Sequence, residues 1–343
     1  MILTFSICDT CYKRVPADIF VRDGAAWITK TCDVHGTTES LVDPDASLML
    51  QHYNTSTLGH NKAILVPITP DCNMSCSWCF TVGTPYQRRS ADYYDRSLLD
   101  YKQRGFTILL SGGEPTTRPD FIPFVRRLQQ LGWPVVTMSN MLAFADPLFM
   151  GQSGLLHNGL LHADFSMQHP KNYDGEVATT KYAALANLER LGAKVNCIQF
   201  SVSDLDELEW IRKFYNDTRQ LYRHIRIRTL YGFGADGSEK IYLSQLYKRF
   251  IEVFGDLTPV ADTSLETSNM YSLYMRDAYC GISLSSSPTV HNVDLLNACR
   301  PTYGRALDGK CYSFPVAQII DQGIRAGWYN GFRIKEVTDE ATS

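Results

Sequence analysis

The chain has 343 residues, of which 44% are hydrophobic and 20% are charged, which is enough for one large domain with small additions. The formal net charge of −3 provides neither a basic field for nucleic acid nor a polybasic patch for a membrane. The N-terminus does not look like a signal peptide, and no apolar run approaches the roughly 20 residues of a membrane span. Ten cysteines in such a chain indicate metal or redox use in a reducing compartment, so we expect a cytoplasmic protein.

Residues 1–58 are expected to form a separate small unit. Two pairs of metal ligands bracket a predicted hairpin, which includes a strand at Ala26–Thr29: Cys8 with Cys11, and Cys32 with His35. Two such pairs about twenty residues apart predict a tetrahedral metal site, and a unit this small needs one to be stable. Zinc is the first choice, and mononuclear iron in a rubredoxin-like site is the second. The alternative is that His35 caps a turn and the cysteines are free thiols.

Residues 59–255 alternate between strand-like and helix-like segments. The predicted strands are 63–68, 106–110, 134–138, 161–167, 194–202 and 225–230. The clearest predicted helices between them are 119–131, 179–191 and one capped by Asp204, and a less regular one lies near 148–156. Six successive βα units predict parallel strands joined by right-handed crossovers. This pattern alone does not separate an open doubly wound sheet from a barrel.

Two motifs follow the first two strands. Cys72, Cys76 and Cys79 come after the first strand, and three thiolates this close can hold three irons of an iron–sulfur cube and leave the fourth iron open. A zinc knuckle or a set of buried thiols is the alternative. Gly112-Gly113-Glu114-Pro115 ends the second strand. Its glycines allow a close backbone approach, and its carboxylate suits an ammonium group. The alternative is that this run forms an ordinary strand-to-helix turn.

Together these motifs resemble the CxxxCxxC and GGEP motifs of the radical S-adenosylmethionine (SAM) superfamily. The resemblance implies a six-stranded partial (β/α)6 TIM-type barrel, with a 4Fe–4S cluster on the three cysteines and SAM on the open iron. It also implies that Gly112, Gly113 and Glu114 face the SAM amine, and that Phe80 is the aromatic residue that usually follows the third cysteine. The N-terminal knuckle resembles that of the subgroup containing archaeal tetraether lipid synthase and a pterin methylase. That likeness covers only the knuckle and the barrel and does not transfer their substrates.

Further SAM contacts are implied at the ends of later strands. The candidates are Ser139, Asn140, Ser166, Gln168 and Arg228. Each has a plainer alternative: a simple turn for the serine–asparagine pair, and a structural ion pair for the arginine. His169, Lys171, Tyr173 and Asp174 point toward the expected substrate side, where most polar loop residues simply face water. Cys197 and Tyr173 are candidates for a catalytic role, although Cys197 also suits a buried core position.

Residues 256–343 are expected to form a loop-rich extension that caps the barrel. Cys280, Cys299 and Cys311 could bind an auxiliary iron–sulfur cluster, or they could be ordinary buried cysteines. Their spacing contains no two-residue cysteine pair and matches no auxiliary pattern.

The sequence therefore predicts a radical SAM enzyme in which a 5′-deoxyadenosyl radical abstracts hydrogen from a small-molecule substrate. The outcome could be oxidation, rearrangement or bond-forming coupling, with flavodoxin or ferredoxin as the electron donor. A peptide-modifying radical SAM enzyme is the alternative. The rival from another class is a zinc-ribbon binding protein on a non-catalytic barrel, which would leave the three clustered cysteines without a purpose.

Overall fold

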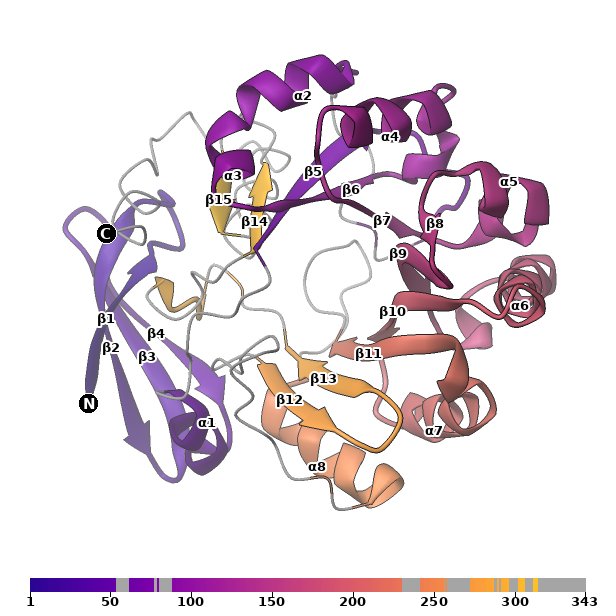
Figure 1. The fold of residues 1–343 in the computed structure, drawn as a ribbon. Coiled ribbons are helices and arrows are strands. Elements are labelled where there is room, and N and C mark those ends of the chain that lie inside the picture. The colour runs from indigo at the N-terminus through magenta and orange to yellow at the C-terminus, as the bar shows by residue number, and fades with distance from the viewer. Residues whose placement is uncertain are drawn as a thin grey trace.

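The computed structural model describes residues 1–53, 62–76, 79, 88–229, 241–255, 257, 272–286, 289, 291–295, 302–305 and 311–313. Within these residues the strands form two sheets, a small antiparallel sheet at the N-terminus and a larger, mostly parallel sheet (Figure 1). None of the helices described is both long and apolar enough to cross a membrane.

The N-terminal sheet has four antiparallel strands in chain order, followed by a short helix. They are β1 (Ile2–Ile7), β2 (Arg14–Arg22), β3 (Ala25–Cys32), β4 (Gly36–Asp43) and α1 (Ala46–Tyr53). Alternate residues of β3 are buried, as in a strand with one face against a core. Asp23 and Gly24 both have positive φ, the conformation of a two-residue type I′ hairpin turn. The predicted strand at 26–29 lies within β3, but the single predicted hairpin is part of a larger sheet.

Six parallel strands lie side by side in chain order in the larger sheet. They are β5 (Ala63–Thr69), β6 (Thr107–Gly112), β7 (Val135–Ser139), β9 (Leu160–Met167), β10 (Lys194–Val202) and β11 (Tyr222–Thr229). Each overlaps a strand predicted from the sequence. The sheet curves, and its helices lie on the outside of the curve (Figure 1). Apolar residues such as Ile64, Val66, Ile108 and Leu110 are fully buried in the core.

The outer helices are α2 (Ala91–Ser97), α3 (Leu99–Gln103), α4 (Phe121–Gln130), α5 (Pro147–Gln152), α6 (Gly175–Arg190), α7 (Glu207–Thr218) and α8 (Leu243–Phe254). The helix predicted at 179–191 begins earlier, because Asp174 accepts a hydrogen bond from the Val177 N–H (2.8 Å) and caps α6. The helix predicted near 148–156 ends early, and the short strand β8 (Leu156–His157) then pairs antiparallel with β9. The helix predicted to start at Asp204 begins at Glu207.

C-terminal strands extend both edges of the barrel. β13 (Gly281–Ser285) pairs in parallel with β11, and β12 (Ser272–Arg276) pairs antiparallel with β13. On the other edge, β14 (Thr302–Arg305) pairs in parallel with β5, and β15 (Cys311–Ser313) pairs with β14. Among the described strands, β12 and β15 end the sheet without meeting, so the predicted partial barrel is confirmed. The extension predicted to be loop-rich supplies these edge strands.

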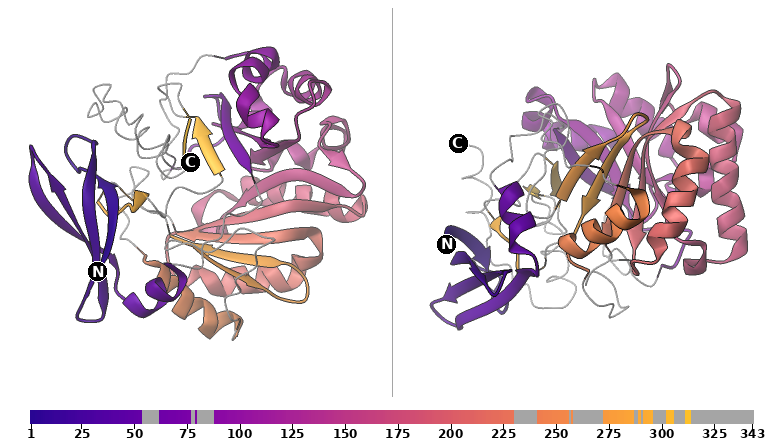
Figure 2. Two further views of the ribbon diagram at one scale, coloured as in Figure 1. Left: turned by 60° about the vertical axis from the view of Figure 1, so that its left-hand side comes forward. Right: turned by 90° about the horizontal axis from the view of Figure 1, so that it is seen from below.

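The N-terminal sheet lies at the open side of the barrel and is joined to the larger domain by specific contacts (Figure 2). Asp43, at the end of β4, accepts a hydrogen bond from the backbone N–H of Ser244 in the first turn of α8 (3.1 Å). Residues 291–295 also meet β1, where the Ser6 hydroxyl donates to the carbonyl oxygen of Val293 (2.6 Å). Because the first N–H groups of a helix have no partner within it, Asp43 acts as a cap supplied by a distant part of the chain.

Replacing this carboxylate should destabilise the protein. We expect Asp43→Ala to lower the free energy of unfolding by about 1–2 kcal/mol, because it leaves buried donors of α8 without an acceptor. Urea titration of the purified protein measures this loss. The control is Asp100→Ala, since Asp100 is an exposed surface residue and its removal should change stability by less than about 0.5 kcal/mol. Equal losses in the two variants would contradict the capping role.

Candidate functional site

The cysteine segment that follows β5 lies directly against the end of β6. The Gly113 N–H donates to the carbonyl oxygen of Thr69 (2.8 Å), and the Glu114 N–H donates to that of Asp71 (2.7 Å). These contacts lie at the carboxyl ends of parallel strands, where barrels of this kind place their active sites. The Gly112–Glu114 turn is therefore in direct backbone contact with the residues that lead into Cys72.

The two glycines have no room for a side chain. A Cβ on Gly112 would overlap the backbone of β5, and a Cβ on Gly113 would lie 2.6 Å from the carbonyl oxygen of Pro70 and closer still to that of Asp71. From the motif alone, these glycines are expected to allow the close approach of a cofactor. In the structure they allow the approach of the backbone that leads into Cys72, and their contact with SAM stays a prediction.

Glu114 joins the ends of β6 and β7. It is 1% exposed, and its carboxylate accepts hydrogen bonds from the Thr116 N–H (3.1 Å) and hydroxyl (2.7 Å), the Ser139 hydroxyl (2.9 Å) and the Asn140 N–H (2.6 Å). Burial raises the pKa of Glu114, and these donors act in the opposite direction. The Asn140 amide also donates to Asn73 of the cysteine segment (2.7 Å). Ser139 and Asn140, both predicted near SAM, therefore hold Glu114 and the cysteine segment in place.

The three clustered cysteines lie in one segment, but among the described residues their sulfurs do not all come within 4.8 Å of one another, as the four knuckle ligands do. Cys72 is exposed, whereas Cys76 and Cys79 are half-buried, and the Cys79 N–H donates to the Cys76 carbonyl (3.0 Å). Burial raises the pKa of Cys72 and of Cys76, and the charge on Cys79 raises both further. Soft thiolates that disfavour one another's charge are stabilised by iron or another soft metal ion, so the donor set fits an iron–sulfur cluster.

Polar groups at the end of β9 face the same end of the barrel. The Gln168 amide donates to the Ser166 hydroxyl (2.7 Å), and in the described part of the chain its buried Oε1 atom has no hydrogen-bond partner. A buried acceptor without a partner is uncommon and fits a ligand that donates to it. The Tyr173 hydroxyl donates to the carbonyl oxygen of Gln168 (2.7 Å), so it already has a backbone partner.

Lys181 of α6 also lies at this end of the barrel, although no motif in the sequence indicates it. Its side chain is fully buried, and its Nζ donates to the carbonyl oxygen of Ser166 (2.6 Å). Burial lowers the pKa of Lys181 to about 8, while the charges of Cys76, Glu114 and Cys72 favour its protonated form. The structure thus places a buried ammonium group at the carboxyl end of β9, beside the end of β7 whose Ser139 contacts Glu114.

Two further candidates lie inside strands. Cys197 is buried in β10, in register with Asp164 and His224, as a core position predicts. Arg228 is half-buried in β11, and burial together with the charge of Arg226 lowers the pKa of Arg228 to about 10. An anion nearby would stabilise this guanidinium, and both a SAM carboxylate and a structural ion pair meet that requirement.

Of the three cysteines in the C-terminal extension, only Cys280 has a side chain within the described part of the chain. Cys280 is buried at the amino ends of the parallel strands, and burial raises its pKa to about 12. Cys311 lies in β15 on the other edge of the sheet, and its side chain is not described. Phe80 and Cys299 lie outside the described residues. The auxiliary cluster therefore stays a prediction.

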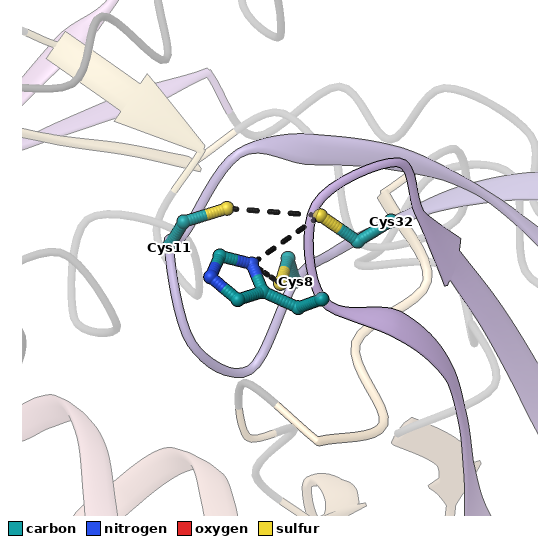
Figure 3. Close-up of side chains that lie close together, drawn as sticks. Cys8, Cys11 and Cys32 are labelled. Atoms are coloured by element: carbon teal, nitrogen blue, oxygen red, sulfur yellow. Dashed lines mark hydrogen bonds between the residues drawn. The ribbon is translucent and has the colours of Figure 1, made fainter.

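The N-terminal knuckle forms a compact ligand set (Figure 3). The sulfurs of Cys11 and Cys32 are 3.9 Å apart, and the His35 Nδ1 lies 3.5 Å from the sulfurs of Cys8 and Cys32. Tetrahedral zinc with ordinary bond lengths would separate two sulfurs by about 3.8 Å and a sulfur from a nitrogen by about 3.6 Å. Backbone N–H groups of Val34 and His35 lower the pKa of Cys32 to about 6, which favours the thiolate that a metal needs. The four predicted ligands therefore fit zinc.

Comparison with protein families agrees with both units. Residues 2–44 match the model described as the HMPTM N-terminal zinc ribbon domain, and residues 66–228 match that of the radical SAM superfamily. A curated relative is the 7,8-dihydro-6-hydroxymethylpterin dimethyltransferase of Methanocaldococcus jannaschii, which is 26% identical over 165 residues. That alignment covers 38% of this chain and 32% of the relative, so the chain spans about a third of the relative's length.

Solved structures of Streptococcus suis SuiB share the fold. SuiB bound to S-adenosylmethionine has a TM-score of 0.51 at 9% identity, and the match covers 90% of this chain and 82% of SuiB. SuiB bound to the precursor peptide SuiA also has a TM-score of 0.51, at 11% identity, covering 86% of this chain and 69% of SuiB. At such low identity the likeness concerns the fold alone. The chain therefore carries a radical SAM domain at residues 66–228, from a superfamily of enzymes that use a 4Fe–4S cluster and SAM, behind an HMPTM-type zinc ribbon at residues 2–44.

Proposed function

We propose that Cys72, Cys76 and Cys79 ligate three irons of the 4Fe–4S cluster and that SAM binds the fourth. The observation that carries this proposal is the direct backbone contact between the cysteine segment and the Gly112–Glu114 turn, at the carboxyl ends of β5 and β6. A cluster and SAM held there would supply reductive, one-electron cleavage of the sulfonium bond, and with it an adenosyl radical able to abstract hydrogen from a substrate.

The residues of this chain bind and orient the cofactors. Asn140 and Glu114 fix the cysteine segment through the hydrogen bonds described above, and we assign the SAM amine to this corner of the site. The acceptor of Gln168 supports a SAM contact at the end of β9, because a ribose hydroxyl could donate to it. We assign the SAM carboxylate to Arg228 near the carboxyl end of β11, because a guanidinium can bind a carboxylate through two hydrogen bonds.

A small molecule is the substrate class we favour. The curated relative is named for a reaction on a pterin, which supports a small molecule over a peptide. SuiB was solved with a precursor peptide, but a shared fold at 11% identity does not favour the peptide-modifying alternative. For the reaction itself we propose oxidation, rearrangement or bond-forming coupling of that small molecule. Flavodoxin or ferredoxin would supply the electron. A cytoplasmic location for this reaction agrees with the free thiols of Cys72, Cys76 and Cys79.

Anaerobic reconstitution distinguishes this function from a zinc ribbon on a non-catalytic barrel. We expect wild-type protein to take up about four irons in the barrel, in addition to the ribbon metal, and to release 5′-deoxyadenosine when it is reduced with dithionite in the presence of SAM. Iron and zinc analysis together with chromatography of the nucleoside products measure both. A protein that holds zinc in the ribbon but takes up no cluster would instead support the non-catalytic alternative.

A further inference from the structure

The buried lysine of α6 lies at the carboxyl end of β9, the end of the barrel at which the cysteine segment lies. α6 begins at Gly175, and Lys181 lies in its second turn with no exposed surface. Its Nζ atom donates to the carbonyl oxygen of Ser166 at the end of β9. It also lies 5.3 Å from the centre of the Tyr173 ring, whose hydroxyl is fixed by the backbone of Gln168. The ammonium group is therefore held in one position at the carboxyl end of the sheet.

This ammonium lies one strand away from the Glu114 cluster. Ser166 follows Phe165, which is in register with Ser139 of β7, and the Ser139 hydroxyl donates to Glu114 (2.9 Å). Burial lowers the pKa of Lys181, and the charges of Cys76, Glu114 and Cys72 act in the opposite direction. The Glu114 carboxylate already accepts four hydrogen bonds from other groups, so it is not a dedicated partner for the lysine. A cluster bound by Cys72, Cys76 and Cys79 would bring thiolate charge to this end of the barrel and so offset the burial of Lys181.

Packing alone does not account for a lysine at this position. Lys181 shares the buried face of α6 with Ala184, Leu185 and Leu188. A leucine or methionine would fill such a position without the cost of desolvating an ammonium group. Because this ammonium has one hydrogen-bond acceptor among the described residues, the position favours a role for the charge itself.

We propose that Lys181 is a positioning charge for the iron–sulfur site, which stabilises the negative charge added when the cluster takes one electron from the external reductant. The inference depends on the proposed function, because it requires a cluster on Cys72, Cys76 and Cys79. Charges near a cluster set its reduction potential, and a buried cation acts through a low dielectric, where its effect is larger than in water. Lys181 therefore raises the midpoint potential and eases electron entry.

The test is a redox titration of the reconstituted cluster, monitored by electron paramagnetic resonance, with neither SAM nor substrate present. Lys181→Met removes the charge and keeps the length, whereas Lys181→Gln also keeps a hydrogen-bond donor. We expect both to lower the ratio of reduced to oxidised cluster at a fixed potential at least tenfold, which equals about 59 mV for a one-electron couple. Lys181→Arg should restore the wild-type potential. Lys194→Met is the matched control, because Lys194 lies exposed at the opposite end of the barrel.

Iron content of every variant is measured alongside the potential. Wild-type potential in Lys181→Gln would overturn the inference while leaving the proposed function intact. Loss of iron in both uncharged variants, with full iron in Lys181→Arg, would also contradict it, because the charge would then act on cluster assembly. Failure of the wild type itself to bind about four irons would reject the proposed function instead.

Discussion

Cys76→Ser should abolish both the barrel cluster and the formation of 5′-deoxyadenosine. A serine hydroxyl is a poor substitute for the thiolate that iron–sulfur clusters require, and Cys76 is the middle ligand of the proposed set of three. We expect iron in the reconstituted variant to fall from about four atoms per chain to background, and SAM cleavage to become undetectable. Iron analysis and nucleoside chromatography measure the two losses independently.

Cys11→Ser is the matched control for this prediction. Cys11 belongs to the N-terminal ligand set, so its replacement should weaken or remove the ribbon metal and leave the barrel cluster in place. A Cys76→Ser protein that still produced 5′-deoxyadenosine would refute the assignment of that residue. Loss of the cluster in the Cys11 variant would mean instead that the two metal sites are not independent.

Gly113→Ala should displace the cysteine segment although it changes no predicted ligand. The added methyl group would meet the carbonyl oxygens of Pro70 and Asp71, which are backbone atoms that cannot rotate away. We expect a loss of stability of about 1–3 kcal/mol, as for other overpacked sites, and a marked fall in cluster content. Urea titration gives the first quantity, and iron analysis after reconstitution gives the second.

Gly151→Ala serves as the control for backbone crowding. Gly151 lies in α5, and a methyl group there would meet no atom within 4 Å, so the substitution should be neutral or slightly stabilising. Full cluster content and unchanged stability in Gly113→Ala would show that the turn tolerates a side chain. The tight contact between the two motifs would then not be what holds the cysteines in place.

The parts of the fold that depend on local patterns could be predicted from the sequence. Buried parallel strands are short apolar runs, and each of the six predicted ones lies in the barrel. The knuckle ligands were predictable because two closely spaced pairs leave few other interpretations, and the four ligand atoms do lie together. Resemblance to a known family was needed to choose a partial barrel over an open sheet.

Contacts between distant segments could not be predicted in this way. Nothing near Asp43 in the sequence indicates that it caps α8, and nothing in the C-terminal region indicates that β14 pairs with β5. Lys181 did carry a local signal, since it lies three and four residues before the buried Ala184 and Leu185 of the same helix. A lysine on the apolar face of a helix usually extends its charged end into water. The complete burial of the Lys181 side chain is therefore visible only in the structure.

The pairing of β14 with β5 has a consequence for how the protein is made. Thr302 lies opposite Ala63, so the strand that leads into the cysteine segment gains its outer neighbour only after more than 230 further residues have been synthesised. Until then that strand exposes unpaired backbone groups to other nascent chains. Iron delivered during translation would therefore meet a cysteine segment whose supporting strand is still an open edge.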